Sequence, residues 1–279
     1  QQKEDLISEY EQKIENKIKE INNNLKEYNF LHKILTETGD ELVVSIIEFL
    51  KWLGFENIVD MDKTKTEGVV FEEDIQINLE NGLLIIECKG IGGTSKDSEC
   101  SQISKIKHRR CKERNSFDVF ALYIVNHQRH IAPLQRQNPP FTENQIKDAI
   151  HDERGLLTTW QLFNLYVDIE NGVITEEEAR ETLLKFGLVE FKPTNLIKIA
   201  TSEKLYQNGT ICSININNIE LRIGDKLFIE KNNKFTTVII LEIQENKKSI
   251  ESISNGQIGL KLSEAIKNDS TIWKKELIK

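Results

Sequence analysis

Two acids and a lysine lie where a β-hairpin would bring them onto one face: Asp74, Glu87 and Lys89. Carboxylates a few ångströms apart repel one another unless a cation lies between them, and hard oxygen ligands suit Mg²⁺ or Mn²⁺. A neighbouring lysine can orient or deprotonate a metal-activated water and stabilise charge on a phosphate. These residue types therefore predict metal-dependent chemistry on a phosphate ester. The plainer interpretation is a hairpin face with ordinary charges.

The segment from Gly68 to Gly90, GVVFEEDIQINLENGLLIIECKG, has the pattern that gathers these side chains. Apolar and polar residues alternate before Asn81-Gly82, which is a strong signal for a type I′ hairpin turn. With those two residues as the loop, the ladder pairs Asp74 with Lys89 and Gln76 with Glu87. We expect these four on a solvent-facing side, and the following residues on a side that enters a core: Ile75, Ile77, Leu79, Leu84, Ile86 and Cys88.

Composition indicates a soluble globular protein with one large domain or two small ones. The chain has 279 residues, of which 38% are hydrophobic and 29% charged. No apolar run approaches the ~20 residues that span a bilayer, so we expect no membrane association. The chain begins Gln-Gln-Lys, without an initiator Met or a signal peptide, so it is either trimmed or part of a longer polypeptide.

The four cysteines lack disulfide-framework density and any CxxC spacing, which favours a reducing cytoplasm. Zinc ligation by Cys100, His108 and Cys111 remains an alternative that no known ligand spacing supports.

A basic segment follows the second acidic strand. The net charge of −8 means that a nucleic-acid binder of this composition needs a local basic patch. A predicted helix over residues 98–114 supplies one, and we expect it to contact DNA phosphates through Lys105, Lys107, Arg109 and Arg110. A solvated helix face is the alternative interpretation.

Residues 3–28 have the spacing of a long amphipathic helix with a narrow apolar stripe. The stripe consists of residues three or four apart among polar ones: Leu6, Tyr10, Ile14, Ile18, Ile21, Leu25 and Tyr28. This pattern favours a coiled coil that joins copies of the chain into a homo-oligomer or binds a partner defence protein. A helix packed on its own domain is the alternative.

A second helix is predicted over residues 40–53 and is apolar almost all round, so it should be buried. Glu41, Ser45 and Glu48 interrupt it on one stripe. The two acids are either additional metal-site carboxylates or a salt-bridged edge.

The remaining pattern divides the chain in two. Helix, hairpin, helix, strand, helix, strand and helix follow one another through residues 36–192, which predicts a mixed-sheet α/β domain after an N-terminal helix over residues 1–35. From residue 193 to 279 the composition changes to short β-type runs separated by Asn, Gly and Lys turns, which predicts a small antiparallel β-barrel. The runs cover residues 211–216, 219–223, 226–230, 235–243, 248–253 and 259–262.

The hairpin acid, the Glu87-Cys88-Lys89 run and the preceding helix resemble the PD-(D/E)xK nuclease superfamily, which has the restriction-endonuclease-like fold. This resemblance covers about residues 36–163. It implies that Asp74 and Glu87 hold Mg²⁺ or Mn²⁺, that the Cys88 backbone carbonyl adds a ligand, and that Lys89 positions the attacking water. Gln102 is similar to the polar residue that many members place beside the metal.

Downstream residues extend the resemblance, and two positions depart from it. Asn126, Pro133, Arg136, Phe141 and the run 156–163 look like the later part of bacterial nuclease-like proteins. Glu73 replaces the proline that names the motif, and the leading helix reads Glu41-Leu-Val where relatives often have Leu-Glu.

The C-terminal segment resembles the β-barrel that follows the GTPase domain in translation factors. Residues 223–227, 238–244 and 254–260 follow the pattern of that barrel. No Gly-x-x-x-x-Gly-Lys-Ser/Thr loop occurs, so no nucleotide is implied. By analogy the barrel is a binding or docking module.

The leading hypothesis is a metal-dependent DNA endonuclease, the nuclease component of a bacterial anti-phage or restriction system. The alternative is a non-catalytic adaptor that assembles with a partner ATPase or effector through its helix and barrel. The intact set of Asp74, Glu87 and Lys89 favours the enzyme. The barrel also suggests a third hypothesis, an RNA-binding or RNA-cleaving protein.

Overall fold

The computed structural model describes residues 2–64, 72–202 and 204–276, and in the first helix it describes the side chains from Ile7 onward except Ser8. The beginning of the predicted hairpin segment, residues 68–71, and the Leu6 side chain lie outside the described part. The chain forms two compact units. The first contains residues 1–163 and 180–189, and the second contains residues 164–179 and 190–279.

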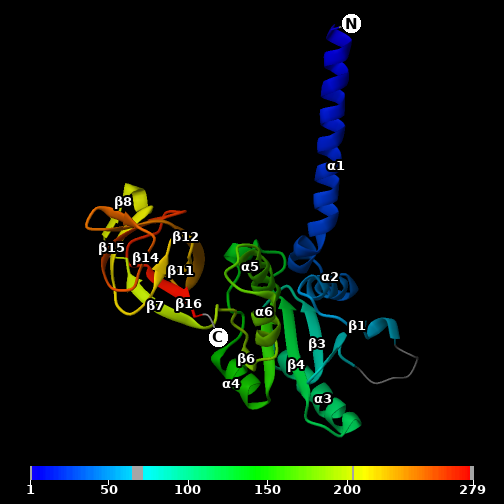
Figure 1. Cartoon of the computed structure of the whole chain (residues 1–279). Coiled ribbons are helices and arrows are strands. Elements are labelled where there is room, and N and C mark those ends of the chain that lie inside the picture. The colour runs from blue at the N-terminus through cyan, green and yellow to red at the C-terminus, as the bar shows by residue number, and fades with distance from the viewer. Residues whose placement is uncertain (1, 65–71, 203, 277–279) are drawn as a thin grey trace. The chain divides into compact units, whose positions relative to one another are not determined.

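A six-stranded mixed sheet forms the centre of the first unit, in the order β1-β2-β3-β4-β5-β6 (Figure 1). The first three strands pair antiparallel, whereas β3 through β6 pair parallel, each with the next. The strands are β1 (Ile58–Asp60), β2 (Ile75–Leu79), β3 (Gly82–Gly90), β4 (Val119–Asn126), β5 (Arg154–Thr158) and β6 (Gly187–Leu188). The coarse prediction of a mixed α/β fold is therefore confirmed.

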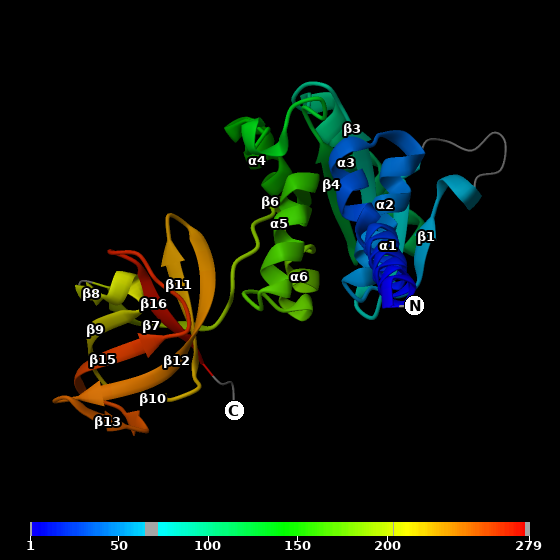
Figure 2. The same ribbon diagram turned by 90° about the horizontal axis from the view of Figure 1, so that it is seen from above.

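Helices cover both faces of this sheet, as Figure 2 shows from a second direction. Alternate residues of β3 and β4, from Leu83 to Val125, form one core cluster with apolar residues of α3. On the opposite face, α2 packs against β3 and α1 packs against α2. The helices are α1 (Gln2–Thr36), α2 (Gly39–Trp52), α3 (Asp97–Arg114), α4 (Glu143–His151), α5 (Thr159–Glu170) and α6 (Glu176–Thr182).

The hairpin register differs from the predicted one by two residues. The ladder pairs Leu79 with Gly82 and Ile75 with Ile86, so Glu80 and Asn81 form the turn. Gly82 is required for another reason: a β-carbon there would lie 2.1 Å from the backbone oxygen of Asp118. Because the shift is an even number of residues, each side chain of the ladder keeps its predicted face, and Asp74 lies just beyond the last ladder pair, Ile75 with Ile86.

The acid-bearing face of the hairpin is not solvent-facing as predicted. Helix α3 lies over it, and Leu83 and Ile85 of that face are buried in the core beneath α3. The side chains that the sequence placed in solvent therefore lie at the margin of a second apolar layer.

Helix α1 is only partly attached to the first unit. Its last turns are anchored by Phe30, Leu31 and Ile34, which are buried. The Arg136 guanidinium donates to the Leu35 carbonyl, and the Asn126 amide donates to the Glu37 carbonyl just after the helix. Toward the N-terminus the helix projects from the sheet (Figure 1).

The second unit contains an eight-stranded antiparallel sheet that curls around its own apolar core. The order is β7-β16-β11-β12-β15-β9-β8, with β13 beside β12, and β10 and β14 form a separate two-stranded pair. Within the described residues no ladder joins β7 to β8, so the predicted barrel is an open, curled sheet. Its strands are β7 (Leu196–Thr201), β8 (Lys204–Tyr206), β9 (Ile211–Ile216), β10 (Leu221–Arg222), β11 (Lys226–Lys231), β12 (Lys234–Glu245), β13 (Lys248–Ile250), β14 (Ser252–Ile253), β15 (Gly256–Leu262) and β16 (Thr271–Lys275).

The division between the units differs from the predicted boundary at residue 193. The segment Asn164–Ala179 groups with the C-terminal strands, although the sequence pattern assigned it to the first domain. Side-chain hydrogen bonds within the second unit explain this grouping: Lys226 donates to the Gly172 carbonyl and Thr237 to the Asn171 carbonyl.

Candidate active site

Asp74 directly precedes β2, and the charge of Glu87 in β3 acts on its carboxylate. The backbone N–H of Asp74 donates to the Ile86 carbonyl at 3.0 Å. The Cys88 backbone N–H donates to Asp74 Oδ2 at 2.6 Å, which fixes the orientation of that carboxylate. Glu87 is 1% exposed. The structure thus brings the two predicted acids together at a buried edge of the sheet.

Lys89 and Gln102 both contact the same oxygen of Glu87. Lys89 Nζ lies 2.6 Å from Glu87 Oε1, and Gln102 Nε2 donates to this atom at 3.1 Å. Lys89 comes from the same strand two residues later, and Gln102 comes from the second turn of α3. Lys89, predicted as catalytic, and Gln102, predicted as supporting, therefore both lie beside Glu87.

Burial and like charge perturb the acid pair. Burial and the neighbouring Glu87 charge raise the pKa of Asp74 to about 7, although the Cys88 N–H and the Lys89 charge act against this shift. Burial alone would lower the pKa of Lys89, but its ion pair with Glu87 outweighs that effect and raises it. The site therefore disfavours two negative charges unless a cation compensates them.

Glu73, which occupies the position of the motif proline, is fully buried in an ion-pair network. The Arg110 guanidinium donates to both of its oxygens, at 2.9 and 3.1 Å, and Gln76 Nε2 donates to Oε1 at 2.6 Å. Arg110 also pairs with Glu72 and Glu113. The sequence signal for this network was the acidic run 72–74 and an arginine on the helix that covers the hairpin.

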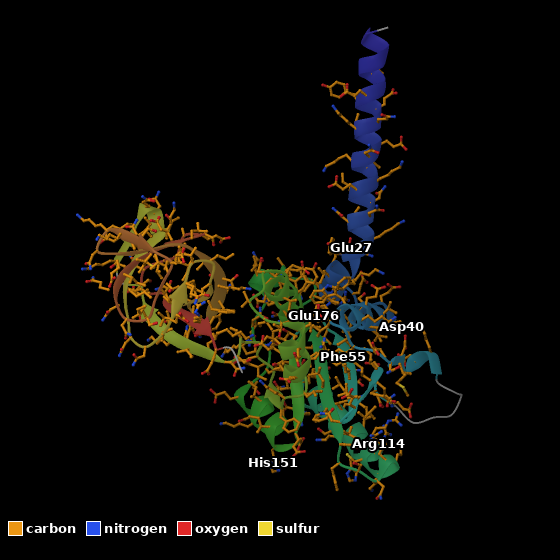
Figure 3. The ribbon with its side chains drawn as sticks, in the orientation of Figure 1. Glu27, Asp40, Phe55, Arg114, His151 and Glu176 are labelled. Carbon is orange, nitrogen blue, oxygen red and sulfur yellow. The ribbon has the colours of Figure 1, made fainter. Side chains whose placement is uncertain are left out.

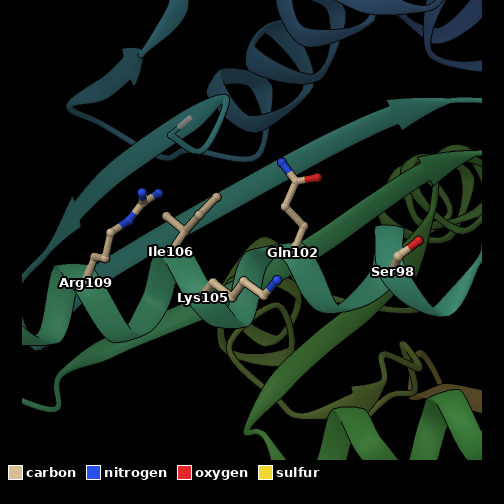
Figure 4. A pocket seen from close by; sticks show the side chains of 5 residues that line it. All are labelled: Ser98, Gln102, Lys105, Ile106 and Arg109. Atoms are coloured by element: carbon tan, nitrogen blue, oxygen red, sulfur yellow. The ribbon is translucent and has the colours of Figure 1, made fainter. Parts of the chain in front are cut away.

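The four predicted phosphate-binding residues of α3 are in different environments. Besides Arg110, Lys107 is also engaged: it contacts the backbone oxygen and the carboxylate of Glu153 at 2.9 and 3.1 Å. Lys105 and Arg109 instead line an open hollow of about 490 Å³, whose other lining residues are Ser98, Gln102 and Ile106. Figure 4 shows Gln102, Ile106 and Arg109 extending from one side of α3. Gln102 thus belongs both to the hollow and to the acid pair.

The supporting acids predicted on α2 do not join the pair. Glu41 is exposed and forms an ion pair with Lys33 of α1 at 2.7 Å, and Glu48 is also exposed. Among the described side chains, no group of three or more His, Cys, Asp or Glu residues could hold a metal. By the same finding, Cys100, His108 and Cys111 do not form a group that could bind zinc. The oxygen ligands available at the site are therefore the two carboxylates and the nearby backbone.

The downstream residues of the predicted motif stabilise the fold around β4. Arg136 is buried, and its guanidinium donates to Asn126 Oδ1 and to the backbone oxygens of Ile131 and Leu35. Asn126 is the last residue of β4. These hydrogen bonds thus attach the end of α1 to the central sheet, and none of them involves Asp74 or Glu87.

Comparison with known proteins gives no family. The sequence matches no family model and no curated protein. Among the described residues, no helix combines the length and the apolar character needed to cross a bilayer.

Three solved structures with partial similarity to the chain have TM-scores below 0.5. The restriction endonuclease FokI has a TM-score of 0.36 and 15% identity over 58% of this chain and 30% of that one. Elongation factor SelB from Methanococcus maripaludis has a TM-score of 0.25 and 11% identity over 87% of this chain and 56% of that one. The C-terminal domain of a putative U32 peptidase from Geobacillus thermoleovorans has a TM-score of 0.25 and 14% identity over 32% of this chain and 100% of that one.

Proposed function

We propose that this protein is a metal-dependent DNA endonuclease that hydrolyses phosphodiester bonds with a restriction-endonuclease-like core. One observation carries the proposal: the Asp74 carboxylate accepts from the Cys88 N–H, next to Glu87 on β3, and Lys89 Nζ lies 2.6 Å from Glu87. This arrangement combines two oxygen ligands with a proton-bearing group at one edge of a sheet.

The residues fit a hard divalent cation. Asp74 and Glu87 would supply carboxylate oxygens and the Cys88 backbone carbonyl a further ligand, and Mg²⁺ needs only one or two protein carboxylates because it keeps several waters. Burial, followed by the Glu87 charge, raises the pKa of Asp74, so a cation at the site would favour its charged form. A bound Mg²⁺ or Mn²⁺ would supply Lewis-acid polarisation of a phosphoryl oxygen and of a water.

The chain's own residues have separate tasks in this proposal. The Cys88 N–H keeps the Asp74 carboxylate in place, and Gln102 does the same for Glu87. The Lys89 ammonium group donates to the attacking water and orients it, and its positive charge stabilises the negative charge that develops on the phosphate. The pKa of that water would be lowered by a bound metal, and its proton would then pass to solvent. Lys105 and Arg109 in the adjacent hollow bind flanking phosphates of the DNA.

The biological setting that we propose is the nuclease component of a bacterial anti-phage or restriction system, as the resemblance to bacterial nuclease-like proteins implies. A non-catalytic adaptor is the second candidate function. The exposed apolar stripe of α1 favours it, because an adaptor needs a surface for a partner.

The test is nicking of supercoiled plasmid by the full chain in Mg²⁺, in Mn²⁺ and in EDTA, with single-stranded DNA and RNA of the same sequence as parallel substrates. We expect nicks in the presence of either metal and none in EDTA. Absence of cleavage on every substrate, together with absence of Mn²⁺ binding by calorimetry, would overturn the nuclease and leave the adaptor. Cleavage of RNA alone would show that the substrate is RNA and not DNA.

A further inference from the structure

Helix α1 presents two apolar faces, and only one of them is used by its own fold. Phe30, Leu31 and Ile34 are at most 8% exposed against the first unit. A second set of seven apolar side chains, which we name the α1 stripe, is between 42% and 64% exposed. The α1 stripe consists of Ile7, Tyr10, Ile14, Ile18, Ile21, Leu25 and Tyr28.

The α1 stripe is not an extension of the face that anchors the helix. With 3.6 residues per turn, its seven members keep a common direction, which lies roughly 145° around the helix from the direction of Phe30, Leu31 and Ile34. The first unit therefore cannot cover the stripe while it holds the end of the helix. Figure 3 shows the side chains of this part of α1, up to the labelled Glu27, standing clear of the sheet and its other helices.

The surface of the stripe is shaped to receive side chains. At its C-terminal end an open hollow of about 560 Å³ is lined by residues of α1: Ile21, Asn24, Leu25, Tyr28, Asn29 and His32. A continuous exposed apolar surface of this kind is uncommon on a monomer and marks an interaction site. Apolar side chains of a second helix would fill such a hollow as knobs fill holes.

The charges beside the stripe identify the occupant and its direction. Helical geometry places Lys13 and Lys17 along one side of the stripe and Glu11 and Glu15 along the other. In a parallel, in-register pair of identical helices, opposite sides meet, so the lysines of each copy lie beside the glutamates of the other. The helix is therefore complementary in charge to a second copy of itself.

The antiparallel alternative is disfavoured by the same charges. Its apolar residues match only when Ile7 lies opposite Tyr28 and Ile14 opposite Ile21. In that arrangement the lysine-bearing sides of the two helices meet each other, and Lys17 of one copy lies against Lys17 of the other.

Existing ion pairs within α1 do not prevent the parallel pairing. Lys13 contacts Glu9 and Lys17 contacts Glu20, while Glu15 contacts Lys19, at 2.6 to 2.9 Å. All these side chains are more than half exposed, and such pairs contribute little to stability, so they can be exchanged for contacts across an interface.

We propose that the α1 stripe is a self-association surface through which two copies of the chain form a parallel, in-register homodimer. Each α1 helix joins the first unit of its own chain at Phe30. The first units of the two copies would therefore lie at the same end of the helix pair, each with its own acid pair. The proposal does not depend on catalysis, because its tests use no substrate.

The first test is sedimentation equilibrium of the full chain. We expect a dimer for the natural sequence. The double variant Ile14→Asp/Ile21→Asp places charges in the seam and should raise the dissociation constant by about 100-fold or more. The matched control, Asn16→Asp/Asn23→Asp, adds the same charge on the opposite side of α1 and should remain dimeric. Circular dichroism confirms that each variant is folded.

The second test reports the direction of the helices by disulfide formation under mild oxidation. The described native cysteines are buried, so a new surface cysteine reacts alone. In the Ile14→Cys variant, a disulfide should form rapidly between the two copies of the dimer. Asn16→Cys lies on the opposite side of α1 and should not form this disulfide. A monomeric natural chain would overturn the proposal, whether the stripe is then covered by the chain's own second unit or by nothing. Preferential cross-linking of Ile14→Cys to Ile21→Cys in a mixture would overturn the parallel direction.

Discussion

The ammonium group of Lys89 and the oxygens of Asp74 and Glu87 should have separable roles, because only the oxygens can bind a metal. Lys89→Met removes the positive charge that orients the water and stabilises the phosphate, and it keeps most of the length of the side chain. We expect the plasmid-nicking rate to fall by about 10²–10³-fold, the usual effect of losing one preorganised hydrogen-bond donor. Mn²⁺ binding measured by calorimetry should persist. An unchanged nicking rate would remove Lys89 from the proposed reaction.

Arg110 illustrates how burial changes the role of a residue that the sequence assigned to DNA. Its guanidinium neutralises Glu73, which is fully buried, so Arg110→Ala would leave an uncompensated charge in the interior. We expect a loss of about 3–5 kcal/mol in the free energy of unfolding by urea.

The matched control for Arg110 is Arg114→Ala, which breaks a more exposed pair with Asp118 and should therefore lower the free energy of unfolding much less. Adding Glu73→Gln to Arg110→Ala should restore part of the lost stability. If both arginine variants lose the same free energy of unfolding, the buried Arg110–Glu73 pair stabilises the fold no more than the exposed Arg114–Asp118 pair does.

Helix α3 has two faces with different functions, and a comparison of lysines can separate them. Lys105 lines the hollow beside Gln102, so Lys105→Glu should weaken DNA binding and reduce the slope of log K against log [salt] by roughly 0.9 or more. Lys147→Glu changes the same charge on the exposed face of α4 and should leave affinity and slope nearly unaltered. Similar slopes for both variants would mean that DNA does not use the hollow.

At the level of elements, local patterns predicted most segments, while contacts distant in sequence decided the remainder. Strand β9 has the predicted ends, because an isolated apolar run defines it locally. The hairpin register was wrong because Gly82 meets the Asp118 backbone, a contact that hairpin statistics do not include. The burial of Glu87 was missed because it results from α3 lying over the strand.

At the level of the whole molecule, the sequence pattern located two units but did not define their exact composition. Segment 164–179 groups with the C-terminal strands through side-chain contacts that composition does not reveal. A truncation after residue 192 would therefore remove partners of Gly172 and Glu178. Likewise, the order of predicted strands along the sequence does not show whether β7 and β8, at the two ends of the curled sheet, pair to close it into a barrel.

Glu178 should make the stability of the second unit depend on pH. Burial alone would raise its pKa, but hydrogen bonds from Lys275 and Thr194 outweigh it and lower the pKa to about 2. The stabilisation is therefore complete above the ordinary value of 4.5 and is lost as pH falls toward 2. Glu178→Gln should cost on the order of 2 kcal/mol at pH 7 and almost nothing near pH 2, measured by thermal unfolding of the full chain. An equal cost at both pH values would contradict this account.

The measurement that tests the central claim most directly compares Glu87→Gln with Glu80→Gln in the Mg²⁺-dependent nicking of supercoiled plasmid. Both changes remove one carboxylate from the same hairpin, but Glu80 is exposed in the turn and Glu87 belongs to the acid pair. Glutamine keeps the size of the buried side chain, so both variants should remain folded. We predict that Glu87→Gln loses nicking and that Glu80→Gln retains the full rate. Full Mg²⁺-dependent nicking by Glu87→Gln would contradict the assignment of this site.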